Sequence, residues 1–251
     1  YSSMTGVSRP SQPEQWPIRP SQTDTLLTTT SRSHATARTS LVLVLVIALL
    51  RGLQAALLMP PWGLIDEAQH FDYVLALSQG RWPVTGQSLL SPAVVDSLFA
   101  TNHWLHFWWS TPASRSVADM GLVAYSYEAY QPPLLYMLLA PLQAVLPGGV
   151  LDQLFVLRLI VVAISLVTVY FVFQTALLLA GSVRMATLAA LVLVFLPERT
   201  LTVSRLNNDV LVEVLGAALC YALVYGLLHS FSWRRAVLVG LLIAAGIWTK
   251  L

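Results

Sequence analysis

The chain of 251 residues is 56% hydrophobic and only 10% charged, with a mean hydropathy of +0.68 and a formal net charge of +2. Soluble domains carry about 25% charged residues, so this composition excludes an ordinary soluble domain and indicates an all-α polytopic membrane protein. No cluster of Lys or Arg indicates nucleic acid as a partner. The single cysteine, Cys220, excludes a disulfide framework and a cysteine-ligated zinc site.

The N-terminal segment, residues 1–40, is polar. It holds 16 Ser or Thr, four Arg and two acidic residues, a composition that cannot bury a core. We therefore predict a disordered cytoplasmic tail. Because the chain starts with Tyr1 and stops within the apolar stretch "GIWTKL", we expect an N-terminal fragment without its C-terminal part, with weak or no turnover by itself.

Apolar stretches of spanning character follow the tail. The first, residues 41–58, has 18 residues and would rise about 27 Å as a helix, just enough for the hydrocarbon core. Arg51 lies inside it, where a structural ion pair or snorkelling competes with a functional role. Residues 158–251 hold the other predicted transmembrane helices, numbers 2 to 5, at 159–180, 185–196, 210–228 and from 236 onward. The third of the five is short, since twelve residues rise only about 18 Å.

The segment "QPPLLYMLLAPLQAVLPGG" (131–149) is apolar but is interrupted by prolines. Its topology follows from the bias of Lys and Arg toward cytoplasmic loops. If this segment does not span the membrane, the tail, Arg184 and the pair Arg234–Arg235 all face the cytoplasm. If it does span, these three arginines face the outside, against the rule. We therefore predict an interfacial or half-buried helix, which makes residues 59–157 one long external loop.

The external loop carries seven acidic residues and two arginines, and it includes the aromatic stretch "NHWLHFWWS". Trp104 and Trp108 stand at helical spacing there, so we predict an amphipathic helix in the headgroup layer, with His103 and His106 as interfacial residues rather than ligands. The same topology places a second loop, "PERTLTVSRLNND", on the outer face. That loop brings further charges to the same side: Glu198, Arg199, Arg205 and Asp209.

The stretch "PPWGLIDEAQHFDYV" directly after the first span carries the main candidate residues. On a helix, Asp66, His70 and Tyr73 would share one face, and Glu67 would neighbour His70. A carboxylate at a membrane boundary is partly desolvated, which raises its pKa and suits it to general-base catalysis. The alternative is a solvated helix start with acids placed favourably near the N-terminal dipole. The spacing alone leaves both interpretations open.

Other segments add charges at the same depth. Glu128 and Gln131 precede a double proline in the external loop, and Asp209 opens a span with Glu213 one turn deeper. Arginines accompany them at Arg158, Arg199 and Arg205. Arginine suits phosphate, whereas a carboxylate suits a hydroxyl, an amine or a metal. This mixture predicts a site that holds a lipid phosphate together with a polar acceptor.

At these residues the sequence resembles membrane glycosyltransferases of the GT-C fold, nearest the protein O-mannosyltransferase and lipid A aminoarabinose-transferase families. The resemblance covers about residues 41–251. It is carried by "P-x-x-x-x-DE-x-x-H-F-x-Y" (Pro61–Tyr73), by "YEAYQPPLLY" (Tyr127–Tyr136), and by shorter elements at Gly80 with Pro83, at "LRL" (157–159), at Asp209 and at "TK" (249–250). The DE element is the most specific part.

The resemblance implies transfer of a sugar, with inversion, from a polyprenyl-phosphate donor on the external face of the plasma membrane of a bacterium. Asp66 matches the family's catalytic acid and Glu67 its partner. His70, Tyr73, Glu128 and Asp209 would contribute to substrate binding. The aminoarabinose-type enzymes have a lysine where this chain has Gln131, so the donor phosphate would be held by Arg158 or Arg205. The acceptor, whether protein, lipid or glycan, is not indicated.

Two other functional classes remain open at this point. A transporter or flippase subunit would use Arg51 and Glu213 as pathway residues. It is disfavoured because no internal repeat is visible and the early loop is long. A non-catalytic membrane scaffold is the third possibility. Some GT-C enzymes use a divalent metal, and if one binds here its ligands would be Asp66, Glu67 and Asp209.

Overall fold

The computed structural model describes residues 22–63, 66–107 and 110–250, with side chains from residue 35 onward. The chain divides into two compact units, residues 1–38 and 39–251, and every named helix after the first lies in the second unit. Helix α1 (Gln22–Leu58) begins before the predicted boundary at residue 41. Residues 1–21 of the predicted disordered tail lie outside the described residues.

All named elements in the described part of the chain are helices, as predicted. Three are long and apolar enough to cross a membrane: residues Ala35–Leu58 of α1, α6 (Val150–Ala180) and α9 (Asp209–Leu228). Helices α7 (Val183–Phe195) and α8 (Pro197–Val203) form a fourth span if they are counted together, with a bend of 68° between them. Pro197 at the first position of α8 accounts for the break, because proline cannot continue the hydrogen bonding of α7. The chain is therefore a helical membrane protein.

The predicted short span at 185–196 corresponds to α7, which reaches the length of a span only if α8 beyond the bend is counted with it. The last predicted span, from 236 onward, corresponds to α10 (Trp233–Ile247). Its 15 residues rise about 22 Å, which is less than the thickness of the hydrocarbon core. Helix α10 is accordingly not among the helices long enough to span by themselves.

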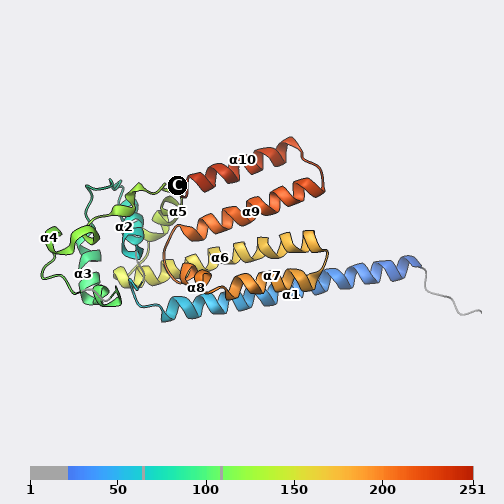
Figure 1. Ribbon diagram of the computed structural model, residues 1–251, viewed down its shortest axis with the longest axis horizontal. Coiled ribbons are helices and arrows are strands. Elements are labelled where there is room, and N and C mark those ends of the chain that lie inside the picture. The colour runs from blue at the N-terminus through green and yellow to red at the C-terminus, as the bar shows by residue number, and fades with distance from the viewer. Residues whose placement is uncertain (1–21, 64–65, 108–109, 251) are drawn as a thin grey trace, which may run out of the picture. The chain divides into compact units, whose positions relative to one another are not determined.

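The long helices pack side by side, with α6 between α7 and α9 and with α10 against α9 (Figure 1). Val44 of α1 belongs to a buried apolar cluster with residues of α6 and α7, among them Phe173 and Ala190. At Gly52, α1 approaches α6 closely, because a Cβ atom there would lie 2.7 Å from Val162 Cγ1. The membrane helices thus form one packed unit within residues 39–251.

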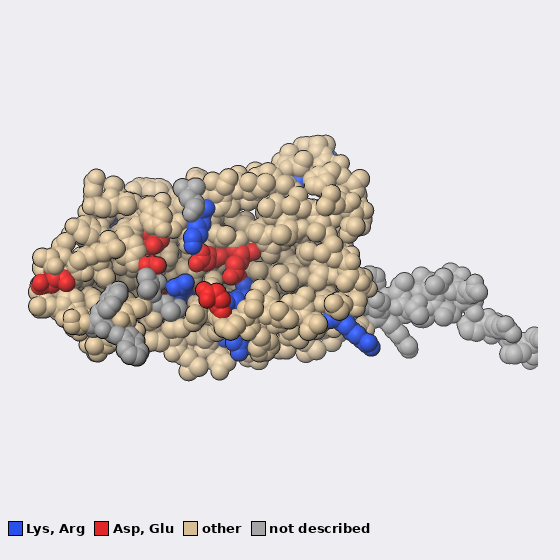
Figure 2. Space-filling model, in the orientation of Figure 1, with Lys and Arg blue, Asp and Glu red and all other residues tan. Residues whose placement is uncertain are grey.

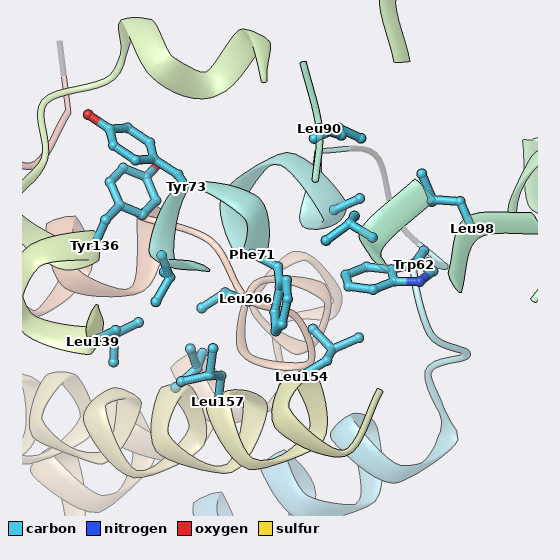
Figure 3. Close-up of a cluster of buried hydrophobic side chains, with 14 of the residues drawn as sticks. Trp62, Phe71, Tyr73, Leu90, Leu98, Tyr136, Leu139, Leu154, Leu157 and Leu206 are labelled. Atoms are coloured by element: carbon cyan, nitrogen blue, oxygen red, sulfur yellow. The ribbon is translucent and has the colours of Figure 1, made fainter. Parts of the chain in front are cut away.

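The segment between α1 and α6 folds at one end of these helices (Figure 1). It contains α2 (Glu67–Ser78), α3 (Pro92–Ala100), α4 (Val117–Met120), α5 (Leu134–Gln143) and the 3₁₀ helices η1 (His103–Phe107), η2 (Gly121–Ala124) and η3 (Tyr127–Tyr130). A buried core joins this segment to the membrane helices (Figure 3). It includes Trp62 and Phe71 from the segment, Leu154 and Leu157 from α6, and Leu206 before α9. The long predicted loop is therefore a folded region.

Helix α5, in the segment predicted as an interfacial or half-buried helix, is too short to cross the hydrocarbon core by itself. Its ten residues rise about 15 Å, half of the hydrocarbon core, and it packs against α2. Leu135 and Tyr136 are fully buried on one side, whereas Leu138 on the other side is 57% exposed.

The prediction for the aromatic stretch after α3 was wrong in part. Trp104 does not lie on the surface, since it is only 3% exposed and packs on Phe99 with ring centroids 4.7 Å apart. His103 is buried as well and its Nδ1 lies 2.8 Å from the Trp62 carbonyl oxygen. The spacing of the aromatic residues indicated a surface helix, but the backbone forms the short 3₁₀ helix η1, which turns these side chains into the core. Trp108 and Trp109 lie outside the described residues.

Candidate functional site

The two adjacent acids at the start of α2 occupy different environments. Asp66 is the N-cap residue and has a left-handed backbone, with φ of 73°. Aspartate tolerates this conformation better than most residues, although it remains uncommon for any residue with a side chain. Its carbonyl accepts the His70 amide at 2.9 Å, and its carboxylate oxygen Oδ1 accepts a hydrogen bond from the Tyr127 hydroxyl. Asp66 is half-buried.

Glu67 points the other way and is fully buried. Arg158 on α6 donates to both of its carboxylate oxygens, from Nε to Oε1 at 2.7 Å and from an Nη atom to Oε2 at 2.5 Å. The Leu206 amide donates to Oε1 at 3.0 Å. Arg158 also donates to the carbonyls of Met59 at 2.7 Å and Pro60 at 2.9 Å. The pair thus ties α2, α6 and the end of α1 together.

This placement differs from the roles predicted for the two residues. Glu67 was predicted as a catalytic residue and Arg158 as a phosphate-binding residue. Both guanidinium edges of Arg158 and both oxygens of Glu67 are used within the fold, and the two side chains are 3% and 0% exposed. We therefore assign the pair a positioning role, with Asp66 as the member of the DE element that stays accessible.

Glu128, on η3, lies beside this N-cap and is only 5% exposed. Burial raises the pKa of its carboxyl group to about 7, and the nearby charge of Asp66 adds to the rise. Its Oε2 lies 4.0 Å from Nε2 of His70. A carboxyl group with a pKa in this range suits a general acid or base near neutral pH.

His70 is buried and neutral. Burial lowers the pKa of its imidazole to about 3, with a further lowering by the charge of Arg205. Nδ1 lies 2.8 Å from the Tyr136 hydroxyl, and the two rings are stacked. Tyr73 stacks on Tyr136 in turn, with ring centroids 4.1 Å apart. The predicted face of Asp66, His70 and Tyr73 is thus directed at residues of η3 and α5.

Gln131 lies at the junction between η3 and the double proline. Its side-chain Nε2 donates to the Tyr130 hydroxyl at 2.7 Å, and its backbone carbonyl accepts from the Tyr73 hydroxyl at 3.4 Å. The side chain is 5% exposed, and its Oε1 atom is buried with no hydrogen-bond partner among the described residues. A hydrogen-bond donor on a ligand would satisfy this oxygen.

The third part of the site comes from the segment before α9 and from the end of α10. Asp209, the first residue of α9, forms an ion pair with Lys250. Asn208 donates to the Thr249 carbonyl at 3.1 Å, and the amide of Leu134 at the start of α5 donates to the Trp248 carbonyl at 3.1 Å. These bonds hold the "TK" element against the "NND" and "QPP" elements.

The charges of these segments act on one another. The charges of Arg205, Asp209 and Lys250 all affect the imidazole of His70, and those of Asp66, Lys250 and Asp209 affect the carboxyl group of Glu128. Figure 2 shows acidic and basic side chains gathered on one part of the visible surface, where the folded loop segment meets the helices. Side chains in or next to α2, η3 and α9, together with Lys250 after α10, therefore form one mixed-charge cluster. We call it the carboxylate site: Asp66, His70, Glu128, Gln131, Arg205, Asp209 and Lys250.

The structure also shows residues that the sequence interpretation missed. Tyr127 and Tyr136 fell inside the quoted "YEAYQPPLLY" stretch but were not assigned roles, and they hold Asp66 and His70. Tyr127 and Tyr136 are nine residues apart with a double proline between them, and this spacing does not indicate that both side chains contact residues at the start of α2. Lys250 was noted only as part of "TK", and it supplies a cation beside Asp209.

The residues named as possible metal ligands do not form a ligand group. In residues 22–63, 66–107 and 110–250, no set of three or more His, Cys, Asp or Glu side chains is arranged to hold a metal ion. Glu67 is bound by Arg158 and faces away from Asp66, and Asp209 pairs with Lys250.

Comparison of the chain with protein-family models, with curated proteins and with solved structures gives no match. The functional interpretation consequently depends on the geometry of the carboxylate site and on the membrane helices that carry it.

Proposed function

We propose that this chain is an integral membrane glycosyltransferase of the GT-C type, which transfers a sugar from a polyprenyl-phosphate donor to an acceptor at the membrane surface. The observation that carries this proposal is the convergence of Asp66, Glu128 and Asp209 with Arg205 and Lys250 at one end of the membrane helices. Such a site offers carboxylates to an acceptor and cations to a phosphate at the same depth.

The carboxyl groups of Asp66 and Glu128 have distinct tasks in this proposal. Asp66 accepts a hydrogen bond from Tyr127, which fixes its orientation toward an acceptor. Glu128 has a raised pKa of about 7 and takes the proton of the acceptor hydroxyl as its oxygen attacks the anomeric carbon. The bond between that carbon and the phosphate oxygen breaks at the same time, and the lipid phosphate leaves with the electron pair. The configuration at the carbon inverts.

Arg205 and Lys250 stabilise the negative charge that develops on the leaving lipid phosphate. Arg205 replaces Arg158 in this role, because Arg158 is committed to Glu67. Gln131 takes the place of a cation before the double proline, and its unsatisfied Oε1 accepts a hydrogen bond from a sugar or acceptor hydroxyl.

The test uses purified protein in lipid nanodiscs, supplied with polyprenyl-phosphate sugars and candidate acceptors. Release of free polyprenyl phosphate is followed by mass spectrometry. We expect Asp66→Asn and Glu128→Gln each to reduce release at least about a hundredfold. Asparagine also tolerates a left-handed backbone, so the first change leaves the start of α2 intact. Asp96→Asn is the matched control, since Asp96 is an exposed acid that pairs with Arg115.

Full release by both variants would remove the carboxylate site from the reaction. In sealed proteoliposomes, movement of a sugar lipid across the bilayer without any free polyprenyl phosphate would instead favour a flippase. Loss of release in Asp96→Asn as well would indicate a general effect of charge on the fold.

We also propose that the carboxylate site faces the outside of the cell. The described acidic residues beyond residue 38 lie in the folded loop segment, in α8, or in the first two turns of α6 and α9. The turns at the other end of the helices carry Arg184, Arg234 and Arg235, as expected of a cytoplasmic side. A cysteine at Ser230 should then react only with reagents on the cytoplasmic side, and one at Gln87 only with reagents outside. The reverse pattern would place the site in the cytoplasm.

A further inference from the structure

A groove lies beside the last turns of α1, and none of the residues assigned to transfer is among those that line it. It has a volume of about 370 Å³ and is lined by α1, by α8 and by the residues that follow each of them. Leu58, at its edge, is 74% exposed. Because residues Ala35–Leu58 have the length and composition of a membrane span, the groove opens toward lipid.

Arg51 brings a positive charge into this groove. One Nη atom donates to Thr200 Oγ1 at 2.9 Å, and the guanidinium lies over the Phe195 ring, 4.9 Å from its centroid. Its Nε atom is buried and makes no hydrogen bond to any described residue. The groove therefore contains a cation with an unused donor.

No carboxylate of the described residues lies within 4.0 Å of this guanidinium. Arg199, which lines a small adjoining cavity together with Arg51, is paired with Glu213. Arg51 has no such acidic partner among the described residues. The charge of Arg51 is not compensated by the fold.

The position of Arg51 on α1 makes it difficult for its guanidinium group to reach the aqueous phase. It lies seven residues before Leu58, about 10 Å along the helix axis from the end of α1. Helical side chains point toward the N-terminus of their helix, which here leads away from this end of the span. An uncompensated charge at that depth is costly unless an anion reaches it.

We propose that this groove, with Arg51 at its base, binds the phosphate of an anionic membrane phospholipid. A phosphate accepts two parallel hydrogen bonds from a guanidinium, and it would satisfy both the charge and the unused Nε donor. Gln54, which also lines the groove, supplies hydrogen bonds for a headgroup. A volume of about 370 Å³ accommodates a headgroup, and the exposed leucine surface of α1 accommodates the start of an acyl chain. This site does not depend on the proposed transfer reaction.

The test is native mass spectrometry of the purified protein with phosphatidylglycerol, with phosphatidylcholine as the zwitterionic comparison. We expect one phosphatidylglycerol molecule to remain bound to the wild-type chain, with weaker binding of phosphatidylcholine. Arg51→Gln should reduce the bound fraction about tenfold, because a charge-assisted pair is removed. Ala55→Phe, which keeps the charge and fills the groove, should reduce it to a similar degree.

Arg115→Gln is the matched control, since it removes one positive charge from an exposed loop residue and should leave lipid binding unchanged. Size-exclusion profiles and unfolding temperatures of all variants establish that each is folded. Equal retention of phosphatidylglycerol by wild type, Arg51→Gln and Ala55→Phe would overturn the proposal. Displacement of the bound phospholipid by an equimolar short-chain polyprenyl phosphate would also overturn it, and would identify the groove as a carrier site.

Discussion

The pair formed by Glu67 and Arg158 permits a quantitative prediction that does not depend on any assigned function. Both side chains are withdrawn from solvent, at 0% and 3% exposure, and the pair is bidentate. Arg158→Met leaves the Glu67 carboxylate buried with only the Leu206 amide as a donor, and it strands the carbonyls of Met59 and Pro60. Removing one partner of a buried ion pair costs about 3–5 kcal/mol.

A loss of that size corresponds to a fall in unfolding temperature of about 6–20 °C for a domain of this length. The assay is thermal unfolding of the purified protein in one detergent, at one concentration and scan rate. Glu67→Gln should cost less than Arg158→Met, because the remaining guanidinium keeps its backbone carbonyl acceptors. The double variant Glu67→Met/Arg158→Met should be more stable than Arg158→Met alone, since it leaves no buried charge.

The exposed pair of Asp96 and Arg115 is the control. Its atoms are also close, with a separation of 2.8 Å, but the two side chains are 64% and 61% exposed. Arg115→Met should therefore change the unfolding temperature little. The reasoning is refuted if Arg158→Met melts within about 2 °C of wild type, or if the effects of the two single changes simply add.

Three further predictions concern single positions. If Glu128 is the base, the rate of transfer should rise between pH 6 and pH 8 with an apparent pKa of about 7, and Glu128→Gln should abolish this rise; a flat wild-type profile would contradict the assignment. The unfolded chain protonates His70 below about pH 6.5 and the folded chain only near pH 3, so His70 by itself contributes a loss of stability of about 2 kcal/mol from pH 7 to pH 5. Glu128, whose pKa is raised in the folded chain, acts in the opposite direction over this range, so the contribution of His70 is the difference between the wild-type and His70→Gln profiles. His70→Gln should remove this dependence of the unfolding temperature and the exposed control His229→Gln should not; equal profiles in both would exclude the buried imidazole as its source. Gly52→Ala should destabilise by about 1–3 kcal/mol because its methyl group meets Val162, and Val162→Ala should restore part of the loss; an unfolding temperature equal to wild type would show that α1 and α6 are not in close contact.

The membrane helices follow from the sequence because their signal is local. Length and uninterrupted apolar character were sufficient to place α1, α6 and α9. The charge bias of the loops also gave the non-spanning helix α5, although that segment is nearly as apolar as a span. The sequence indicated the bend between α7 and α8 only indirectly, because the predicted span at 185–196 has too few residues to cross a membrane. In the structure α7 ends just before Pro197, which is the first residue of α8.

The loop segment was harder because its structure depends on contacts across long separations in the chain. Trp104 was predicted at the surface from its spacing, but the short η1 helix rotates it into the core. Arg158 and Glu67 are separated by 91 residues, so nothing local identifies them as partners. One signal was present: Glu67 shares its helix face with Phe71 and Val74, both fully buried, and an acid on an apolar face requires a buried partner.

The two acids of the DE element consequently depend on each other. Glu67 is the first residue of α2, and its bonds to Arg158 and to the Leu206 amide fix that first turn against α6 and against the segment before α9. Asp66 directly precedes this fixed turn, so its left-handed backbone and its bond to Tyr127 are held without any strong contact of its own to α6. A buried acid that cannot meet a substrate thereby determines where the accessible one lies. Glu67→Gln should for this reason lower activity through the placement of Asp66, even though its carboxylate touches no reactant.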